Sequence, residues 1–162
     1  RRLASQIAAS SELRGMATTA VAMLAGDGVA TLAHVGDSRG YRLRAGALER
    51  LTRDHSWVEE QIRVGALTEE AARQHPWRNI VTRALSGSEE LEVELQELEL
   101  QAGDRLLLCS DGVFAVLSDD EIGEVLGRDA TLDQICEALI QGANDGGGPD
   151  NVTAVVLQVD AV

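Results

Sequence analysis

Apolar and polar positions alternate in several stretches of the chain, and this period of two predicts β-strands with one buried face. The expected strands are residues 16–25, 29–35, 41–44, 47–51, 91–100, 105–110 and 152–159. Gly26-Asp27-Gly28 joins the first two strands as a hairpin turn, which gives Asp27 a structural role. The alternation slips once, at Gln96-Glu97, and this slip predicts a β-bulge. The run Leu106-Leu107-Leu108 has no polar side, so its strand is expected to be buried on both faces.

Other stretches repeat their apolar residues with the period of a helix. The expected helices are residues 1–13, 56–64 and 68–74, a helix that starts after Ser118, and residues 131–143. Ser56, Ser118 and Thr131 each open a capping box, in which the hydroxyl and the side chain three residues later satisfy free backbone amides. Residues 79–85 fit neither period. Antiparallel strands with segregated helices define an α+β fold, and the absence of a linker in the sequence predicts one domain over residues 1–162.

The composition predicts a packed domain with an acidic surface. Of the 162 residues, 44% are apolar, which is enough for a core, and the net charge is −13. Such a chain cannot neutralise nucleic-acid phosphates, so no nucleic-acid partner is expected, whereas its carboxylates are compatible with divalent cations. Cys109 and Cys136 lie far apart in apolar runs, and both are expected to be buried, inert thiols.

The apolar runs and the first residues bear on location. No run approaches the roughly 20 apolar residues that span a bilayer, and no signal peptide is visible. We therefore expect no membrane span in this chain and a cytoplasmic location. The chain starts with Arg1 rather than Met, inside a helical pattern, which indicates a fragment of a longer protein.

Three aspartates lie beside the ends of expected strands. Asp37 follows the strand that ends at Val35, Asp111 follows the strand of residues 105–110, and Asp150 precedes the last strand. If the last two strands are antiparallel neighbours, Asp111 and Asp150 project from the same sheet edge. Carboxylates brought together there repel, and one is driven towards protonation. A divalent cation removes that penalty, and oxygen ligands suit Mg²⁺ or Mn²⁺.

Taken one at a time, these motifs are weak evidence for a metal site. Asp-Gly after a strand is more often a turn than a ligand, and Asp150-Asn151 is also typical of a turn. The run Gly146-Gly147-Gly148 is not a phosphate loop, because a strand follows it and it has no Lys. An unrelated Mg²⁺ or Ca²⁺ binding domain is therefore one interpretation of the three aspartates.

Four motifs, taken in order, resemble the metal-dependent (PPM, type 2C) Ser/Thr protein phosphatases, and bacterial members most closely. They are Gly15-Met16-Ala17-Thr18-Thr19, Val35-Gly36-Asp37-Ser38-Arg39-Gly40, Cys109-Ser110-Asp111-Gly112 and Gly148-Pro149-Asp150-Asn151-Val152-Thr153. The resemblance covers nearly the whole chain, and residues 52–87 resemble the region that carries the mobile flap of bacterial members.

The resemblance implies a fold, a cofactor and a reaction. The family fold is an antiparallel β-sandwich flanked by helices in α-β-β-α layers, which this chain would form in part. Asp111 and Asp150 match ligands of the first metal, and Asp37, with Asp111, matches a third and weaker site. The intact family domain holds two Mg²⁺ or Mn²⁺ ions besides that weaker site, and a metal-activated water attacks phosphoserine or phosphothreonine. The implied partners are phosphorylated proteins, including a Ser/Thr kinase or its substrates.

The chain lacks the N-terminal third of the family's pattern. That third carries an Asp-Gly-Met-Gly-Gly motif with the metal-bridging Asp, a phosphate-binding Arg and a His thought to be the general acid. No catalytic residue therefore maps onto this chain, no substrate-binding residue is assigned, and the fragment alone is expected to be inactive or nearly so. A non-catalytic phosphatase-like sensor or partner-binding domain is the alternative function.

The remaining candidates have plain structural interpretations. His34 is expected to be a packed or surface residue, and His55 and His75 are expected to face solvent or form local hydrogen bonds. Arg39 fits a structural salt bridge as well as a substrate contact. Thr18 and Thr19 are expected to pack or to form hydrogen bonds in the core.

Overall fold

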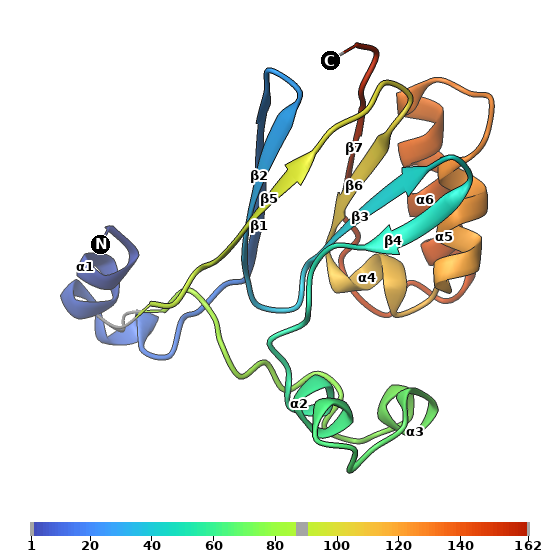
Figure 1. Ribbon diagram of the computed structural model, residues 1–162. Coiled ribbons are helices and arrows are strands. Elements are labelled where there is room, and N and C mark those ends of the chain that lie inside the picture. Colours follow the sequence, from blue (N-terminus) through green and yellow to red (C-terminus); the bar gives the residue numbers. More distant parts are fainter. Residues whose placement is uncertain (1, 87–90, 162) are drawn as a thin grey trace.

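The computed structural model describes residues 2–86 and 91–161, which form two antiparallel β-sheets with helices around them (Figure 1). The first sheet has the order β1-β2-β5, with β1 Ala20–Gly26, β2 Val29–Val35 and β5 Glu94–Glu99. The second has the order β4-β3-β6-β7, with β3 Arg39–Arg44, β4 Ala47–Arg50, β6 Arg105–Cys109 and β7 Ala154–Gln158. The helices are α1 Arg2–Ala9, the short 3₁₀ helix η1 Ser11–Leu13, α2 Trp57–Arg63, α3 Glu69–Arg73, α4 Asp111–Phe114, α5 Asp119–Leu126 and α6 Leu132–Asp145. The α+β class is confirmed.

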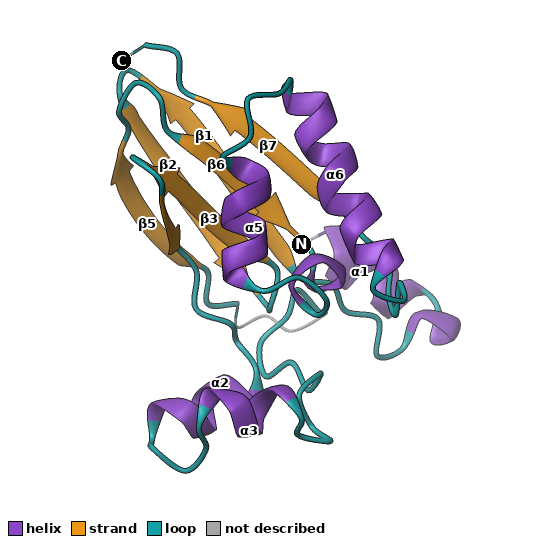
Figure 2. Cartoon of the chain, turned by 90° about the vertical axis from the view of Figure 1, so that its right-hand side faces the viewer, coloured by secondary structure: helices purple, strands orange, loops and turns teal. Residues whose placement is uncertain are grey.

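Two cores hold the layers together, one on each face of the second sheet. Between the sheets, Leu32 and Leu98 of the first sheet pack with Leu106 of β6. On the other face, α5 and α6 cover the sheet, as Figure 2 shows, and bury Leu107. Because Leu106 and Leu107 are adjacent, their side chains enter opposite cores, and both are at most 1% exposed. The prediction of a strand buried on both faces is confirmed.

The outer face of the first sheet carries exposed apolar side chains. Leu24 is 79% exposed and Leu95 is 67% exposed, and in the described part of the chain no helix covers this face (Figure 1). The predicted bulge is wrong, because the β2–β5 register runs without interruption from Val29↔Glu99 to His34↔Glu94. The apolar pattern slips because Leu95 lies on the outer face and Leu98 on the inner one, which an odd spacing of three requires.

Several element boundaries differ from the prediction. The strand expected from residue 16 begins at Ala20, because Thr18 forms only an isolated bridge, with Leu85. Residues 79–85, which fit neither period, pair in strand-like fashion only in this bridge and in one other. The helix expected over residues 1–13 breaks at Ser10, whose backbone is extended (φ −138°, ψ 124°). The helix α4 was not predicted at all.

Capping explains where the longer helices begin. Ser118 and Thr131 form the complete, reciprocal capping boxes that the sequence predicts. Ser56 is only half of one: its hydroxyl accepts a hydrogen bond from the Glu59 amide, but the Glu59 carboxylate pairs with Arg50 instead of returning to the cap. An ion pair with the neighbouring strand therefore competes with the cap for this carboxylate.

A buried ion pair at the turn before β6 predicts part of the acid sensitivity of the fold. Asp104 is 1% exposed, accepts hydrogen bonds from Arg44 Nε (2.7 Å) and Nη2 (2.6 Å), and its pKa is lowered by that guanidinium. Its stabilising contribution is present above the usual Asp pKa of about 3.9 and is lost as pH falls below it. We expect the gap in unfolding free energy between the wild type and Asp104→Asn to be constant from pH 7 to 5 in urea titrations. The gap should narrow below about pH 4, and an unchanged gap at pH 3 would contradict the assignment.

Candidate metal centre

The three predicted aspartates lie at one end of the strands of the second sheet, and this row of strand ends is the sheet edge that the aspartates share. In this sheet β3, β6 and β7 are neighbours, and Arg39, Cys109 and Ala154 stand side by side across them. Asp37 lies two residues before Arg39, and Asp111 lies two residues after Cys109, so antiparallel pairing brings both to the same edge. Asp150 lies just before β7 at that edge. The expected antiparallel pairing of the last two strands is confirmed.

Hydrogen bonds lock the loop of Asp111 to the loop that follows Asp150. The Ser110 hydroxyl accepts a hydrogen bond from the Thr153 amide (3.0 Å) and donates one to the Asn151 carbonyl (3.2 Å). A glycine is required at position 112, where the two loops meet, because a Cβ there would lie 2.3 Å from the Asn151 carbonyl oxygen. The segment predicted as an acidic turn is the start of α4, with Asp111 as its first residue.

Thr19 fixes the turn that carries Asp37. Its hydroxyl shares a hydrogen bond of 2.9 Å with the Ser38 hydroxyl, on one side of the aspartate. On the other side, Gly36 has φ +109°, and a Cβ there would lie 2.3 Å from the Thr19 methyl group. The hydrogen bond predicted for Thr19 is therefore present, and it serves the Asp37 turn.

The electrostatics of this edge favour a cation. Burial raises the pKa of Asp37, and the charge of Asp111 raises it further. Burial likewise raises the pKa of Asp111, and the charge of Asp150 adds to the shift. A divalent cation at this edge would offset the repulsion that makes Asp37 and Asp111 harder to ionise, and carboxylate oxygen donors fit Mg²⁺ or Mn²⁺. Among the described residues, the three do not bring one oxygen each within 4.8 Å of the others, so they form an open edge and not a closed cage.

Arg39 is fully engaged by neighbouring side chains. Its Nε and Nη2 donate to the two oxygens of Asp54 at 2.9 and 2.7 Å, and its Nη1 donates to the Tyr41 hydroxyl. The guanidinium also lies 3.7 Å from the ring centre of Phe114 in α4. Of the two roles considered for Arg39, the structure shows the salt bridge. Asp54 was not singled out from the sequence, because it lies in the connection between β4 and α2, 15 residues from its partner in β3.

His34 is packed and His75 forms a local hydrogen bond, as predicted, whereas His55 bonds residues that are distant in the sequence. His34 is 3% exposed, and His55 contacts Gly36 and Glu94 as well as the His34 ring, at a centroid distance of 4.7 Å. His75 stacks on Trp57 at 4.8 Å and accepts a local hydrogen bond from the Trp77 amide. The cluster of His34, His55 and Glu94 was not predicted, although His55 lies in the segment of residues 52–87 that resembles the flap region.

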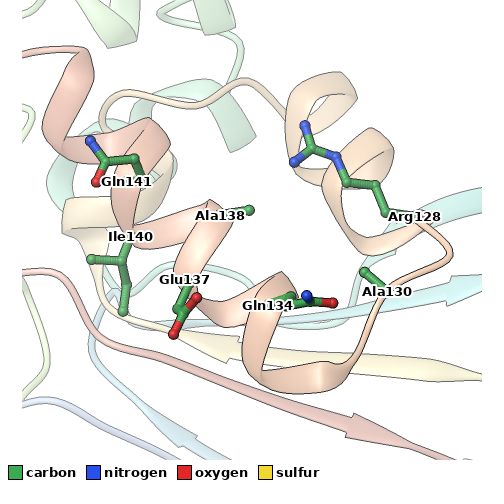
Figure 3. Close-up of a pocket in the computed structure, with 7 residues that line it drawn as sticks. All are labelled: Arg128, Ala130, Gln134, Glu137, Ala138, Ile140 and Gln141. Atoms are coloured by element: carbon green, nitrogen blue, oxygen red, sulfur yellow. The ribbon is translucent and has the colours of Figure 1, made fainter.

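The cysteines and an open groove beside α6 lie apart from this chemistry. Cys109 is buried, and burial raises the pKa of its thiol to about 12, so it is inert as predicted. Cys136 is only partly buried, which corrects the expectation for it. An open groove of about 740 Å³ runs beside α6 and the end of α5. In Figure 3 its polar side chains, such as Arg128 and Glu137, spread apart and form no convergent site.

The family model for protein phosphatase 2C matches residues 2–149 of this chain. The match extends over most of the described fold and includes two of the three edge aspartates. The chain therefore belongs to the protein phosphatase 2C family, and the resemblance noted in its motifs is confirmed.

Curated relatives agree with this assignment. The chain is 40% identical over 149 residues to the serine/threonine phosphatase stp of Listeria monocytogenes, covering 92% of this chain and 59% of that protein. It is 43% identical over 160 residues to the serine/threonine protein phosphatase PstP of Mycobacterium tuberculosis, covering 97% of this chain and 30% of that protein. The chain thus spans well under two thirds of the length of these relatives.

A solved structure of the same class has the same fold. The crystal structure of the Mycobacterium tuberculosis phosphatase PstP/Ppp superposes with a TM-score of 0.94 at 42% identity, covering 98% of this chain and 67% of that one. The catalytic domain of PstP in complex with two manganese ions superposes with a TM-score of 0.90 at 41% identity, covering 98% and 66%.

Proposed function

We propose that this chain is part of a metal-dependent protein phosphatase that hydrolyses phosphoserine and phosphothreonine in proteins. The observation that carries the proposal is the row of Asp37, Asp111 and Asp150 along one sheet edge, where burial and mutual repulsion raise the pKa of the first two. The manganese complex of PstP and the phosphatase names of the relatives support the same chemistry.

In this proposal the aspartates hold Mg²⁺ or Mn²⁺, and Asp111 is the shared ligand between its two neighbours. A bound divalent ion would neutralise charge on phosphoryl oxygens and lower the pKa of a coordinated water. The chain's own part is to present carboxylates from loops locked together by Ser110, so that the ligands are held before the ion arrives. The groups that bind phosphate and donate the leaving-group proton are not assigned to residues of this chain.

The proposal extends to partners and location. Phosphorylated proteins are the substrates, including a Ser/Thr kinase or the substrates of that kinase, and the enzyme works in the cytoplasm. In the described residues no helix has the length and apolar character needed to cross a membrane. The inactivity of the fragment by itself stays a prediction.

Metal removal tests the proposed function. The intact protein is incubated with a phosphothreonine peptide, and phosphate release is measured with Mn²⁺, after chelation and after Mn²⁺ is restored. We expect release that falls to background on chelation and returns with Mn²⁺. Release that survives exhaustive chelation would exclude a metal-dependent reaction, and a protein that never releases phosphate would favour the alternative of a non-catalytic binding domain.

A further inference from the structure

A cluster of two histidines and a glutamate lies between the first sheet and the segment of residues 52–86. His34, His55 and Glu94 each bring one ligand-type atom within 4.8 Å of the others, and this is the one such group among the described residues. The His34 ring is 3% exposed, and neither of its nitrogens has a hydrogen-bond partner in the described part of the chain. Two imidazoles and a carboxylate are the donor set of a Zn²⁺ site.

The hydrogen bonds of His55 argue against a metal in this cluster. The Gly36 amide donates to His55 Nδ1 at 3.1 Å, so in the neutral ring the hydrogen must be on Nε2. That Nε2 lies 3.1 Å from Glu94 Oε2, to which it donates. A cation would need the lone pair that this hydrogen occupies, and the Arg83 guanidinium already lies 3.3 Å from the same nitrogen. Histidines that bind metal donate from their other nitrogen, whereas here that nitrogen accepts.

The same bonds give His55 a different role, at the turn of Asp37. The His55 amide donates to the Gly36 carbonyl at 2.8 Å, and the Gly36 amide donates back to the His55 ring. Gly36 directly precedes Asp37, and with φ +109° it has no side chain that could hold the turn by packing. The Gly36 backbone is therefore held by a reciprocal pair of bonds with His55, in addition to the Thr19–Ser38 hydrogen bond on the other side of Asp37.

His55 also belongs to the base of the segment that contains α2 and α3. Its carbonyl accepts from the Thr82 amide at 2.8 Å, and the next residue, Ser56, forms an isolated bridge with Val81. The segment leaves and returns at the end of the sandwich where the β2–β3 connection and α4 lie, the lower end in Figure 1. One residue thus contacts the Asp37 turn and both ends of the segment.

We propose that His55 is a positioning residue that holds the Asp37 turn at the metal centre and joins it to the segment of residues 52–86. Glu94 fixes the ring tautomer by accepting from Nε2, which leaves Nδ1 free to accept from Gly36. His55 does not contact the reaction. It acts through the backbone of Gly36, and the inference rests on the proposed role of Asp37 as a metal ligand.

Two substitutions separate the two nitrogens of the ring. In His55→Asn, Oδ1 stands at the same bond distance from the backbone as Nδ1 and still accepts from Gly36, but the contact with Glu94 is lost. In His55→Gln, the amide reaches towards Glu94, but no acceptor remains at the Nδ1 position. Partners of this kind typically change metal affinity about 10- to 100-fold when removed. We expect His55→Gln to weaken Mn²⁺ affinity about 10-fold and His55→Asn to stay within about 3-fold of the wild type.

The experiment has two readouts on the intact protein. The first is exchange of the Gly36 amide hydrogen without metal, followed by NMR; it should be about 10-fold faster in His55→Gln than in the wild type and near normal in His55→Asn. The second is Mn²⁺ affinity by calorimetry, together with the Mn²⁺ dependence of phosphate release. The Mn²⁺ concentration for half-maximal rate should rise in His55→Gln, while kcat at saturating Mn²⁺ stays unchanged.

Each other outcome has a definite meaning. Equal Mn²⁺ affinity in both variants, with the wild type binding normally, would overturn the positioning role and leave the proposed function intact. A wild type that binds no Mn²⁺ would overturn the proposed function, and the positioning role with it. Tight Zn²⁺ binding by the wild type that His34→Gln abolishes would show that the cluster is a metal site after all.

Discussion

Replacing Asp111 with Asn is expected to lower Mn²⁺-dependent phosphate release by about 100- to 1,000-fold, because a divalent ion contributes several kcal/mol to such a reaction and each 1.36 kcal/mol is a factor of ten. Among the three aspartates, substitution of Asp111 is expected to lower the rate most, because Asp111 interacts electrostatically with both Asp37 and Asp150. Asn keeps the size of the side chain and removes the charge that attracts the cation. The measurement is the initial rate of phosphate release from a phosphothreonine peptide by the intact protein.

Stability should move in the opposite direction from activity. Since burial and Asp150 raise the pKa of Asp111, its charged form is unfavourable in the metal-free fold. Asp111→Asn is therefore expected to unfold at the same or a higher urea concentration than the wild type without metal. Asp27→Asn is the matched control, because Asp27 is an exposed turn residue with φ 51°, a conformation that Asn also adopts. Equal rates for Asp111→Asn and the wild type would contradict the proposal that Asp111 is a metal ligand.

The strand pattern was predictable because it follows from local sequence. Alternation and the Gly26-Asp27-Gly28 turn place the β1–β2 hairpin within a few residues of the observed register, from Ala20↔Val35 to Gly26↔Val29. The predicted bulge fails because alternation records burial, and in β5 an apolar residue lies on each face. Leu95 breaks the pattern because it lies on the outer face of the sheet, which no helix covers in the described part of the chain. The slip in the apolar pattern therefore does not indicate an extra residue in the strand.

The candidate site was predictable in part, for a related reason. Its aspartates flank strands, so strand order alone brings them to one edge. The supporting residues depend on packing between distant segments: Asp54 reaches Arg39 across 15 residues of sequence, and Glu94 reaches His55 across 39. No spacing rule encodes such contacts. The short helix α4 was missed because Asp-Gly after a strand is typical of a turn, and its four residues are too few for a helical period.

The supporting contacts make the proposed metal centre dependent on a buried ion pair. Arg39 connects two parts of the site: it donates hydrogen bonds to Asp54, and its guanidinium lies over the ring of Phe114, which is in the helix that begins with Asp111. The Asp54 charge also acts on Asp37 and Asp111, and it adds to the rise in the pKa of each. The guanidinium neutralises Asp54 and packs against α4, so it contributes both to the fold and to the placement of the proposed metal ligands.

Breaking this pair is expected to cost far more stability than breaking an exposed ion pair of the same chain. The Arg39 and Asp54 side chains are 16% and 9% exposed, and Asp54→Ala leaves the guanidinium without its anion in a poorly hydrated site. Removing one partner of a buried pair typically costs about 3–5 kcal/mol. We expect a loss of that size in the unfolding free energy, measured by urea titration at pH 7.

Two controls separate the buried charge from the loss of a contact. Glu49→Ala removes the partner of Arg42, but Glu49 is 56% exposed, so its loss should cost at most about 1 kcal/mol. The double variant Arg39→Met with Asp54→Leu removes both charges and keeps apolar volume, and it should be more stable than Asp54→Ala alone. If Asp54→Ala loses no more unfolding free energy than Glu49→Ala, the Arg39–Asp54 pair does not stabilise the fold as a buried pair, and the structural role of Arg39 is contradicted.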